Sequence, residues 1–332
     1  MFAVNQLGVA ILLCLVTMLG WGSWANTQKL AGKQSWPFPL YYFDYAIGVF
    51  ALGVLLFFTA GSFGSVGSPA LENIEQAGGH AIVRALLSGV LFNIANVLLV
   101  VAIDSAGMAI AFPVGIGLAL VIGTVTSYLE APKGNPLLIS LGVIFVVAAM
   151  IVSALAHKRM QRARSGANTG RGLIFALVAG AVMGLFYPHL TSAISPDFNT
   201  APIRPGMLTP YTALLLFGVG LLGSNFIVNT ILIRSSGLRY REYLRASPRL
   251  HSLGFLGGLI WMLALSCNVL ASGVAGPAIS YALGQGATLV AALWGVFIWK
   301  EFRGGPAGTS TLTWVMLVSY AIGLTLIGLA TL

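Results

Sequence analysis

The sequence predicts an all-α polytopic membrane protein with ten transmembrane helices arranged as two inverted five-helix repeats. Three observations lead to this fold class. Of the 332 residues, 58% are apolar and only 8% are charged, whereas roughly 25% are charged in a typical globular protein. The apolar residues gather in runs long enough to cross a membrane, and the two halves of the chain resemble each other. A soluble protein of this size would lack the charges to cover its surface.

Ten apolar runs supply the expected spans, because a helix that crosses a bilayer needs about 20 predominantly apolar residues. Gly and Pro mark the turns between runs, and no connection is long enough for a soluble domain. We interpret the first run as a retained span rather than a signal peptide, since no Lys or Arg precedes Lys29. The expected spans cover residues 6–26, 38–60, 81–103, 107–129, 136–156, 171–193, 209–233, 252–272, 276–299 and 310–331.

The basic residues predict how the chain is oriented. The net charge is +9, but Lys and Arg lie between the apolar runs, so we expect topology signals and no nucleic-acid partner. Connections after even-numbered spans carry only Arg84, Lys133 and Arg204. Most basic residues lie in the connections after odd-numbered spans. Positive loops face the cytoplasm, so these connections are cytoplasmic and we expect both termini outside the plasma (inner) membrane. The connections after odd-numbered spans carry Lys29, Lys33, Lys158, Arg159, Arg162, Arg164, Arg171, Arg234, Arg239, Arg241, Arg245, Arg249, Lys300 and Arg303.

Two stretches of the chain align without a gap. The stretches are residues 89–117 and 258–286, and ten of the 29 aligned positions are identical, several of them glycines. They belong to spans 3–4 and 8–9, so spans 1–5 correspond to spans 6–10. Five is an odd number, so the second copy enters the membrane from the opposite side, as in many secondary transporters. The alternative is an old duplication that is kept only for packing.

The repeat divides the chain into three parts. We expect a first five-helix repeat at 1–157, a basic cytoplasmic linker at 158–170 and a second, inverted repeat at 171–332. Spans 4 and 9 contain the glycine motifs at 113–117 and 284–286, which allow either close helix packing or close approach of a ligand.

Short motifs in the first two spans resemble a known group of transporters. The stretches Gly20-Trp21-Gly22-Ser23-Trp24-Ala25-Asn26 and Tyr42-Phe43-Asp44-Tyr45-Ala46-Ile47 are similar to ureide permease-like proteins and glucose/ribose porters. They are more distantly similar to bacterial rhamnose–proton symporters, and the ten-span layout resembles the drug/metabolite transporter superfamily. The resemblance implies proton-linked uptake of a small, mostly neutral polar solute. The short stretch after His157 departs from the long central loop of plant ureide permeases, which favours a sugar over a ureide.

Two ionisable residues are candidates for proton coupling. Asp44 lies near the start of the second span, and a charged side chain at a helix centre costs about 2.5–3.5 kcal/mol on insertion scales. It either handles a proton or the substrate during transport, forms an ion pair with Lys29 or Lys33, or is solvated at the membrane interface. His189 near the end of the sixth span either relays protons or is a hydrogen-bonded structural residue.

Neutral polar and aromatic side chains inside the spans are candidates for solute binding. Amides and phenols both donate and accept hydrogen bonds, which suits an uncharged polar solute, and an indole offers a flat apolar face to a ring. The competing interpretation is helix adhesion for the amides and anchoring at the membrane interface for the tryptophans. The candidates are Trp21, Trp24, Asn26, Tyr41, Asn93, Asn96, Tyr187, Asn225, Asn268, Tyr281 and Gln285.

These features favour a secondary transporter that takes up a sugar-like solute. We expect protons and the lipid bilayer as its partners, and the sequence leaves a homodimer open. The alternative solute is a ureide or nucleobase, and the alternatives to transport are a membrane enzyme or a scaffold. Cys14 and Cys267 each lie in an apolar run, so we expect no disulfide framework, metal or cofactor. There is no Walker-type phosphate loop for an ATP-driven pump, and acidic and His residues are too scattered for an enzyme.

Overall fold

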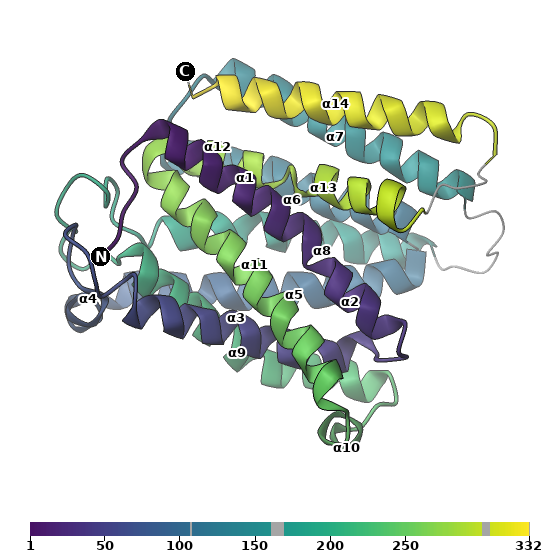
Figure 1. Cartoon of the computed structure of the whole chain (residues 1–332), viewed down its shortest axis with the longest axis horizontal. Helices are drawn as coiled ribbons and strands as arrows, with labels where there is room; N and C mark the ends of the chain where they lie inside the picture. The colour runs from purple at the N-terminus through teal and green to yellow at the C-terminus, as the bar shows by residue number, and fades with distance from the viewer. Residues whose placement is uncertain (107, 161–168, 301–305, 332) are drawn as a thin grey trace.

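The protein is a bundle of long helices packed side by side (Figure 1). The computed structural model describes residues 1–106, 108–160, 169–300 and 306–331, and these contain no β-strand, only two isolated bridges. The long helices are α1 (Leu7–Ser23), α3 (Phe38–Phe58), α5 (Gly79–Ala106), α6 (Met108–Glu130), α7 (Pro136–Met160), α8 (Thr169–Thr191), α9 (Pro210–Ser235), α11 (Pro248–Ala275) and α14 (Thr309–Leu329). The shorter ones are α2 (Ala25–Gly32), α4 (Ala70–Gln76), α10 (Tyr240–Leu244), α12 (Pro277–Gly284), α13 (Ala287–Leu293) and the π-helix η1 (Trp294–Ile298).

Nine helical segments of the described chain are long and apolar enough to cross a membrane. The fourth expected span is the exception, because its described apolar stretch, Val114–Glu130, is shorter. The prediction of an all-helical integral membrane protein is therefore confirmed, and the tenth span stays a prediction. Residues 107 and 161–168, including Arg162 and Arg164 of the expected linker, lie outside the described residues, as does Arg303.

Two spans differ from the expected helices. The first span continues beyond Asn26 to Gly32, because α2 follows α1 after a turn at Trp24 and packs against α11. The Thr27 hydroxyl of α2 also hydrogen-bonds the Tyr41 hydroxyl of α3 at 2.7 Å. The ninth span is interrupted at Gln285 and Gly286, between α12 and α13. An added Cβ at Gly284 would lie 2.8 Å from both Asn268 Nδ2 and the Trp21 ring, so close packing of this segment requires glycine.

Long helices that the predicted repeat pairs with each other run in opposite directions. The segment before α1 meets the segment after α8, where Asn199 Nδ2 donates to the Val4 carbonyl at 3.2 Å. The beginning of α3 meets the end of α9, where Asn229 Nδ2 donates to the Pro39 carbonyl at 2.7 Å. The beginning of α7 likewise meets the end of α14, which packs along it (Figure 1).

Two glycine-based helix crossings repeat the same geometry. An added Cβ at Gly89 of α5 would lie 2.1 Å from the Phe217 carbonyl oxygen of α9, and one at Gly258 of α11 would lie 2.0 Å from the Tyr45 carbonyl oxygen of α3. Gly89 and Gly258 are paired in the sequence alignment of the two halves. Two backbones therefore touch at each crossing, and the α5–α9 crossing corresponds to the α11–α3 crossing.

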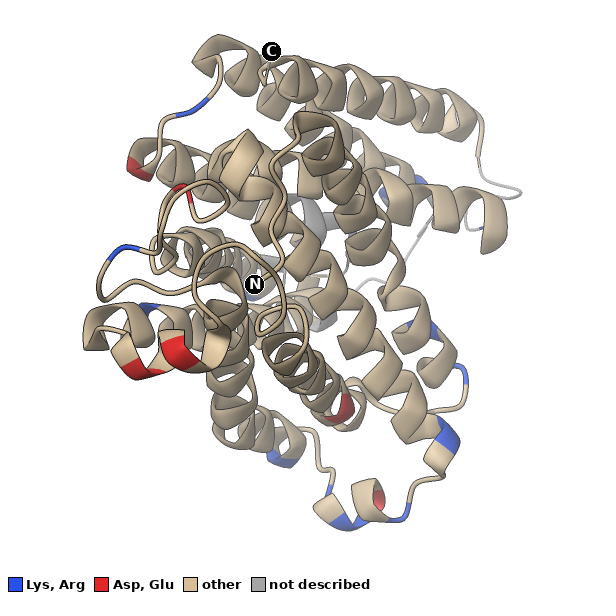
Figure 2. Cartoon of the chain, turned by 60° about the vertical axis from the view of Figure 1, so that its left-hand side comes forward, with Lys and Arg blue, Asp and Glu red and all other residues tan. Residues whose placement is uncertain are grey.

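The two ends of the bundle differ in charge. We call the end that carries α4 the α4 end and the one that carries α10 the α10 end. Three basic residues, Arg84, Lys133 and Arg204, belong to the α4 end. The described basic residues of the other connections gather at the opposite end, many of them around α10 (Figure 2). This separation of basic residues is the pattern that the positive-inside rule uses to orient a membrane protein.

Candidate functional site

A cavity of about 520 Å³ lies at the α4 end. It is formed where α6, α8 and α11 end and where α5 and α12 begin, and its volume is in the range of small-molecule sites. The Ser127 side chain is buried in its wall, and its hydroxyl has no hydrogen-bond partner. Its polar lining comprises Arg84, Ser127, Glu130, Lys133, Thr191, Ser192, Ser195, Asp197 and Ser272.

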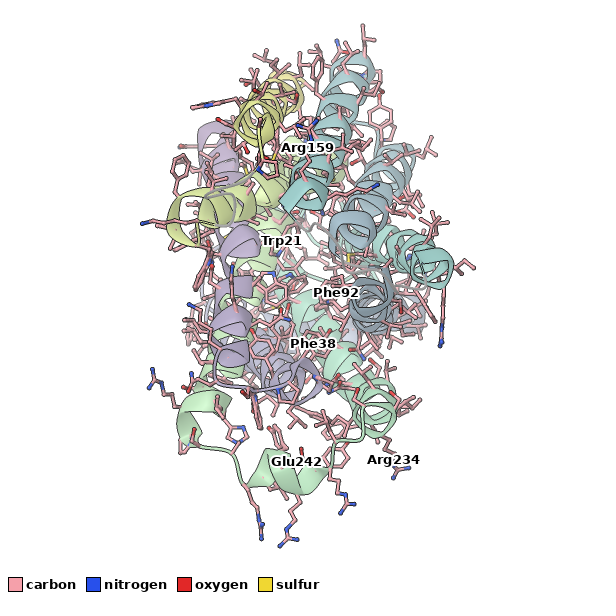
Figure 3. All side chains as sticks on the ribbon, turned by 90° about the vertical axis from the view of Figure 1, so that its right-hand side faces the viewer. Trp21, Phe38, Phe92, Arg159, Arg234 and Glu242 are labelled. Atoms are coloured by element: carbon pink, nitrogen blue, oxygen red, sulfur yellow. The ribbon has the colours of Figure 1, made fainter. Side chains whose placement is uncertain are left out.

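Aromatic rings from five helices meet in the middle of the bundle. The Trp261 ring of α11 lies 4.2 Å from that of Phe92 (α5), 5.8 Å from that of Trp21 (α1) and 5.7 Å from that of Phe217 (α9), measured between centroids. Tyr45 of α3 lies 6.4 Å from Trp261. We call Trp21, Tyr42, Tyr45, Phe92, Phe217 and Trp261 the central aromatic cluster; Figure 3 shows Trp21 and Phe92 toward the middle of the molecule. It joins helices of both halves.

Several buried polar atoms around this cluster have no hydrogen-bond partner. They are Trp21 Nε1, the Tyr42 and Tyr45 hydroxyls, Asn96 Nδ2 and both amide atoms of Asn225. Asn96 lies next to the Tyr42 hydroxyl without the geometry of a hydrogen bond. Asn225 precedes Asn229 by one turn on the same face of α9, which places it level with Tyr42, since Asn229 contacts Pro39. Buried polar groups are normally paired, so this concentration of unpaired donors and acceptors indicates a place for a polar ligand.

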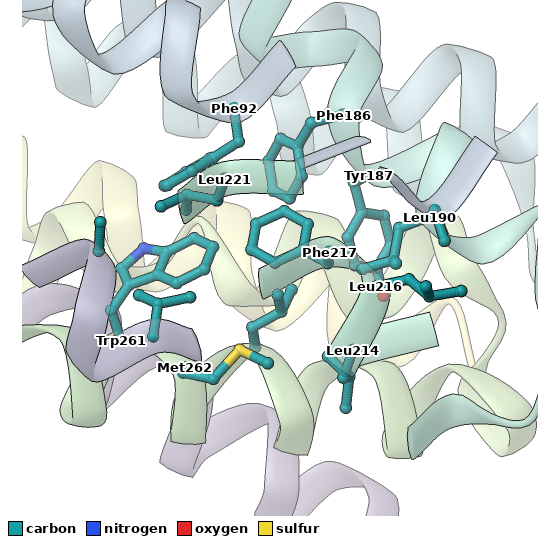
Figure 4. Packing of buried hydrophobic residues seen from close by; sticks show 14 of the residues in the cluster. Phe92, Phe186, Tyr187, Leu190, Leu214, Leu216, Phe217, Leu221, Trp261 and Met262 are labelled. Carbon is teal, nitrogen blue, oxygen red and sulfur yellow. The ribbon is translucent and has the colours of Figure 1, made fainter. Parts of the chain in front are cut away.

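Phe186 and Tyr187 of α8 extend the packing of aromatic rings beyond the central aromatic cluster (Figure 4). Phe186 lies 5.1 Å from Phe92 and 6.4 Å from Trp261. Tyr187 stacks on Tyr281 of α12 at 4.9 Å, and its hydroxyl is 3.0 Å from the Ser280 hydroxyl. Both residues closely precede Thr191 and Ser192, which line the cavity. The two rings therefore connect the central aromatic cluster to the part of α8 that borders the cavity.

Asp44 is buried at the α10 end and has two hydrogen-bond donors. The Tyr243 hydroxyl of α10 donates to Oδ1 at 2.7 Å, and Nδ1 of His251 on α11 lies 3.0 Å from both carboxylate oxygens. Trp36 packs against the rings of Tyr243 and His251. We call Asp44, Tyr243 and His251 the Asp44 cluster. Burial, followed by the Asp44 carboxylate, raises the pKa of the Tyr243 hydroxyl, so this group stays a donor at physiological pH.

The ion pair proposed between Asp44 and a lysine is therefore replaced by a different arrangement. The ammonium groups of Lys29 and Lys33 lie 4.3 and 4.5 Å from the centroid of the Trp299 ring. Trp299 Nε1 donates to Asn26 Oδ1 at 2.6 Å. Asn26 and Trp299 thus join α2 to the segment after η1.

The remaining predicted site residues are spread along the bundle. Trp24 packs against Tyr45 at 5.1 Å, beside the central aromatic cluster. Asn93 donates to Ser224 at 2.9 Å, which joins α5 to α9. Asn268 donates to the Ser280 carbonyl at 2.7 Å, and Gln285 lies at the interruption of the ninth span. His189 lies near the cavity, at the end opposite Asp44, and its Nδ1 is 2.8 Å from the Leu185 carbonyl oxygen of its own helix.

No group of three or more His, Cys, Asp or Glu side chains in the described part of the chain is placed to hold a metal ion. Cys14 and Cys267 are both buried as free thiols.

The sequence profile of the ureide permease family matches residues 152–330, which is more than half of the chain. The chain belongs to the ureide permease family. Ureide permease 1 of Arabidopsis thaliana is 20% identical to this permease over 97% of each chain. One solved crystal structure covers 96% of the permease and 97% of its own chain with a TM-score of 0.58. At 15% identity it supports the fold alone.

Family membership changes the order of our predictions. The protein is a transporter of a small solute and not an enzyme, as predicted. The sugar that we placed first has no support from these relatives, and the alternative, a ureide or nucleobase, agrees better with the family. The short stretch after His157 does not exclude the family, because the plant relative aligns with this 332-residue chain over 382 positions, which leaves room for a longer loop in the relative.

Several residues of the candidate site are not among those predicted from the sequence. Tyr243 and His251 lie in the connection between the predicted spans 209–233 and 252–272. Their sequence position gives no reason to pair them with Asp44, about 200 residues earlier. Trp261 lacks a neighbouring polar motif, although it aligns with Phe92 in the internal repeat. That alignment was the one signal that would have indicated both rings.

Proposed function

We propose that this permease takes up a small, neutral, ureide-like solute by alternating access between two inverted halves. The observation that carries the proposal is the set of unpaired buried polar atoms around the central aromatic cluster. A cyclic ureide or nucleobase is a planar ring with N–H donors and carbonyl acceptors, so its faces suit the aromatic rings and its edge suits Asn96, Asn225 and Tyr42.

The arrangement of the helices supports the alternating-access part of the proposal. Corresponding helices run in opposite directions, and the α5–α9 crossing corresponds to the α11–α3 crossing. Such a pair of halves has two related conformations that open to opposite sides. The cavity opens at the α4 end, which the positive-inside rule places outside. In this orientation the termini and the cavity face outward and α10 faces the cytoplasm.

Uptake into proteoliposomes tests the solute class. We expect labelled allantoin, as the test ureide, or uracil, as the test nucleobase, to enter, and unlabelled glucose and ribose not to compete. Flux of glucose without flux of allantoin or uracil would contradict the proposed solute class.

The matched variants Asn225→Ala and Asn229→Ala test the site. Asn225 has no partner, whereas Asn229 already bonds Pro39. We expect Asn225→Ala to raise the KM for the transported solute about tenfold, the effect of about 1.4 kcal/mol of lost binding. Asn229→Ala is expected to lower stability and leave KM unchanged. Equal KM values in both variants would remove the central cluster as the binding site.

Proton coupling through Asp44 is the second part of the proposal. If the Asp44 carboxylate carries the coupled proton, Asp44→Asn abolishes accumulation driven by a pH gradient and spares solute exchange. Wild-type accumulation by Asp44→Asn would show that another group couples transport to protons. His189, the other predicted proton carrier, has only its own helix as a hydrogen-bond partner among the described contacts.

A further inference from the structure

We propose that Tyr243 and His251 are the positioning residues of the proton site, and that their hydrogen bonds to Asp44 hold α10 and the beginning of α11 more firmly against α3 while the carboxylate is ionised. This inference rests on the proposed function, because it explains how proton binding at Asp44 would open the cytoplasmic side. Beyond the proposed function, it assigns roles to Tyr243 and His251, states that protonation of Asp44 weakens the contact, and identifies α10 as the segment that moves.

The geometry of the Asp44 cluster suits an ionised carboxylate, with the Tyr243 hydroxyl and Nδ1–H of His251 as its donors. An ionised carboxylate is an acceptor only, whereas a protonated one carries an O–H donor of its own. Oδ1 accepts from Tyr243, and both oxygens face Nδ1 of His251. Protonation of Asp44 removes the negative charge that strengthens both hydrogen bonds, because charge-assisted hydrogen bonds are the stronger kind. The contact between α10 and α3 is therefore weakened when a proton binds.

Among the described residues, no other ionisable side chain hydrogen-bonds the Asp44 carboxylate. Tyr41 lies one turn earlier on α3, and its hydroxyl bonds Thr27. The charged residues around the cluster on α10 and the beginning of α11 are exposed to solvent. These exposed residues are Arg241, Glu242, Arg245 and Arg249. On the α2 side, Lys29 and Lys33 lie over Trp299.

A comparison with the opposite end of the bundle shows what is special about this contact. The short helices α4 and α10 follow corresponding spans, the second and the seventh. Asn73 of α4 holds the beginning of α9: its side chain donates to the Met207 carbonyl at 3.0 Å and accepts from the Thr209 amide at 2.8 Å. Tyr243 of α10 holds α3 in the same way, but through a carboxylate. An amide does not titrate and a carboxylate does, so of these two contacts only the one at the α10 end responds to protons.

The structure also gives the proton a short path to solvent. The Asp44 side chain is 7% exposed and that of His251 is 28% exposed. Gly254 of α11 permits this depth, because an added Cβ there would lie 2.5 Å from Asp44 Cβ. Separation of Tyr243 and His251 from the carboxylate would uncover Asp44 to the cytoplasmic side, where it can release the proton and rebind both donors.

Spin labels on α10 and α3 test the inference without any solute. Leu244 and Ile47 are exposed positions outside the Asp44 cluster. Labels at cysteines there, in a chain with Cys14→Ala and Cys267→Ala in lipid nanodiscs, report the α10–α3 distance as a function of pH. We expect the distance to increase as the pH falls through one midpoint. Asp44→Asn should show the longer distance at every pH.

The positioning residues are tested by the shift of that midpoint. Tyr243→Phe and His251→Gln each remove or weaken a bond to the ionised form, so each should raise the midpoint by about one pH unit. Tyr240→Phe is the matched control on α10, because the Tyr240 hydroxyl contacts Thr230 and not Asp44. His189→Gln is the matched control for the imidazole. Neither control should move the midpoint.

Two results would overturn the inference. One is a midpoint that is the same in Tyr243→Phe, His251→Gln and the parent chain, and the other is a pH-dependent separation that persists in Asp44→Asn. The label distances require no substrate, so they remain informative if no ureide or nucleobase is transported. Conversely, the α10–α3 distance could stay constant with pH while ureide uptake is observed. That result would leave the proposed function standing and would remove this mechanism.

Discussion

The crossing of α5 and α9 depends on Gly220, and its replacement by alanine provides a strong test of the packing. An added Cβ at this position would lie 2.0 Å from the Leu86 carbonyl oxygen and 2.9 Å from its carbonyl carbon. Both contacts are to backbone atoms within a helix, so no side-chain rotation can relieve them. Because ordinary contacts begin near 3.4 Å, the two helices must separate by more than 1 Å in Gly220→Ala.

The expected cost follows from this displacement. Overpacking of a well-packed interior typically costs about 1–3 kcal/mol. Gly→Ala in a helix also brings a gain of up to about 1 kcal/mol in helix propensity. Gly223, one turn later on α9, has no atom within 4 Å of an added Cβ, so Gly223→Ala carries the propensity term alone. The difference in free energy of unfolding between the two variants should therefore be about 1–3 kcal/mol.

Reversible unfolding by SDS in mixed micelles, followed by tryptophan fluorescence, measures this difference. We expect Gly220→Ala to unfold at a lower SDS fraction than Gly223→Ala, and Gly223→Ala to match or exceed the parent chain. Equal stability of the two alanine variants would refute the close approach of α5 and α9. It would also weaken the correspondence between this crossing and the α3–α11 crossing.

Two further predictions concern the core and the orientation of the chain. Trp261→Ala should lower the free energy of unfolding by about 3–5 kcal/mol, the usual cost of removing a large buried aromatic ring. Trp261 contacts rings from α1, α3, α5 and α9. The control is SDS unfolding of Trp314→Ala, because Trp314 is 63% exposed. Arg204→Cys should react with a membrane-impermeant maleimide from outside intact cells, and Arg241→Cys should react only after permeabilisation. Background labelling should be low because Cys14 and Cys267 are buried. The reverse labelling pattern would invert the proposed orientation.

Part of the candidate site was accessible from sequence because polar residues in apolar runs are conspicuous. Trp21, Asn96 and Asn225 were singled out for this reason, and the structure places all three around the central aromatic cluster. Asn26, Asn229 and Asn268 have the same sequence signature, yet each hydrogen-bonds another segment of the bundle. Periodicity shows which face a residue occupies but not what lies opposite, so adhesive and ligand-facing amides look alike.

What the sequence determined by itself is the class of the molecule. The low charge, the apolar runs and the segregation of basic residues predict an integral membrane protein, because the cost of burying charge in lipid acts on each residue of a span separately. The internal alignment carries the expectation of two related halves in the same way. The partners of Asp44 were decided only by tertiary structure. Tyr243 and His251 reach Asp44 because α11 crosses α3 closely and α10 lies over the end of that crossing. Contacts between residues some 200 positions apart depend on how helices pack, and no local pattern in the chain encodes them.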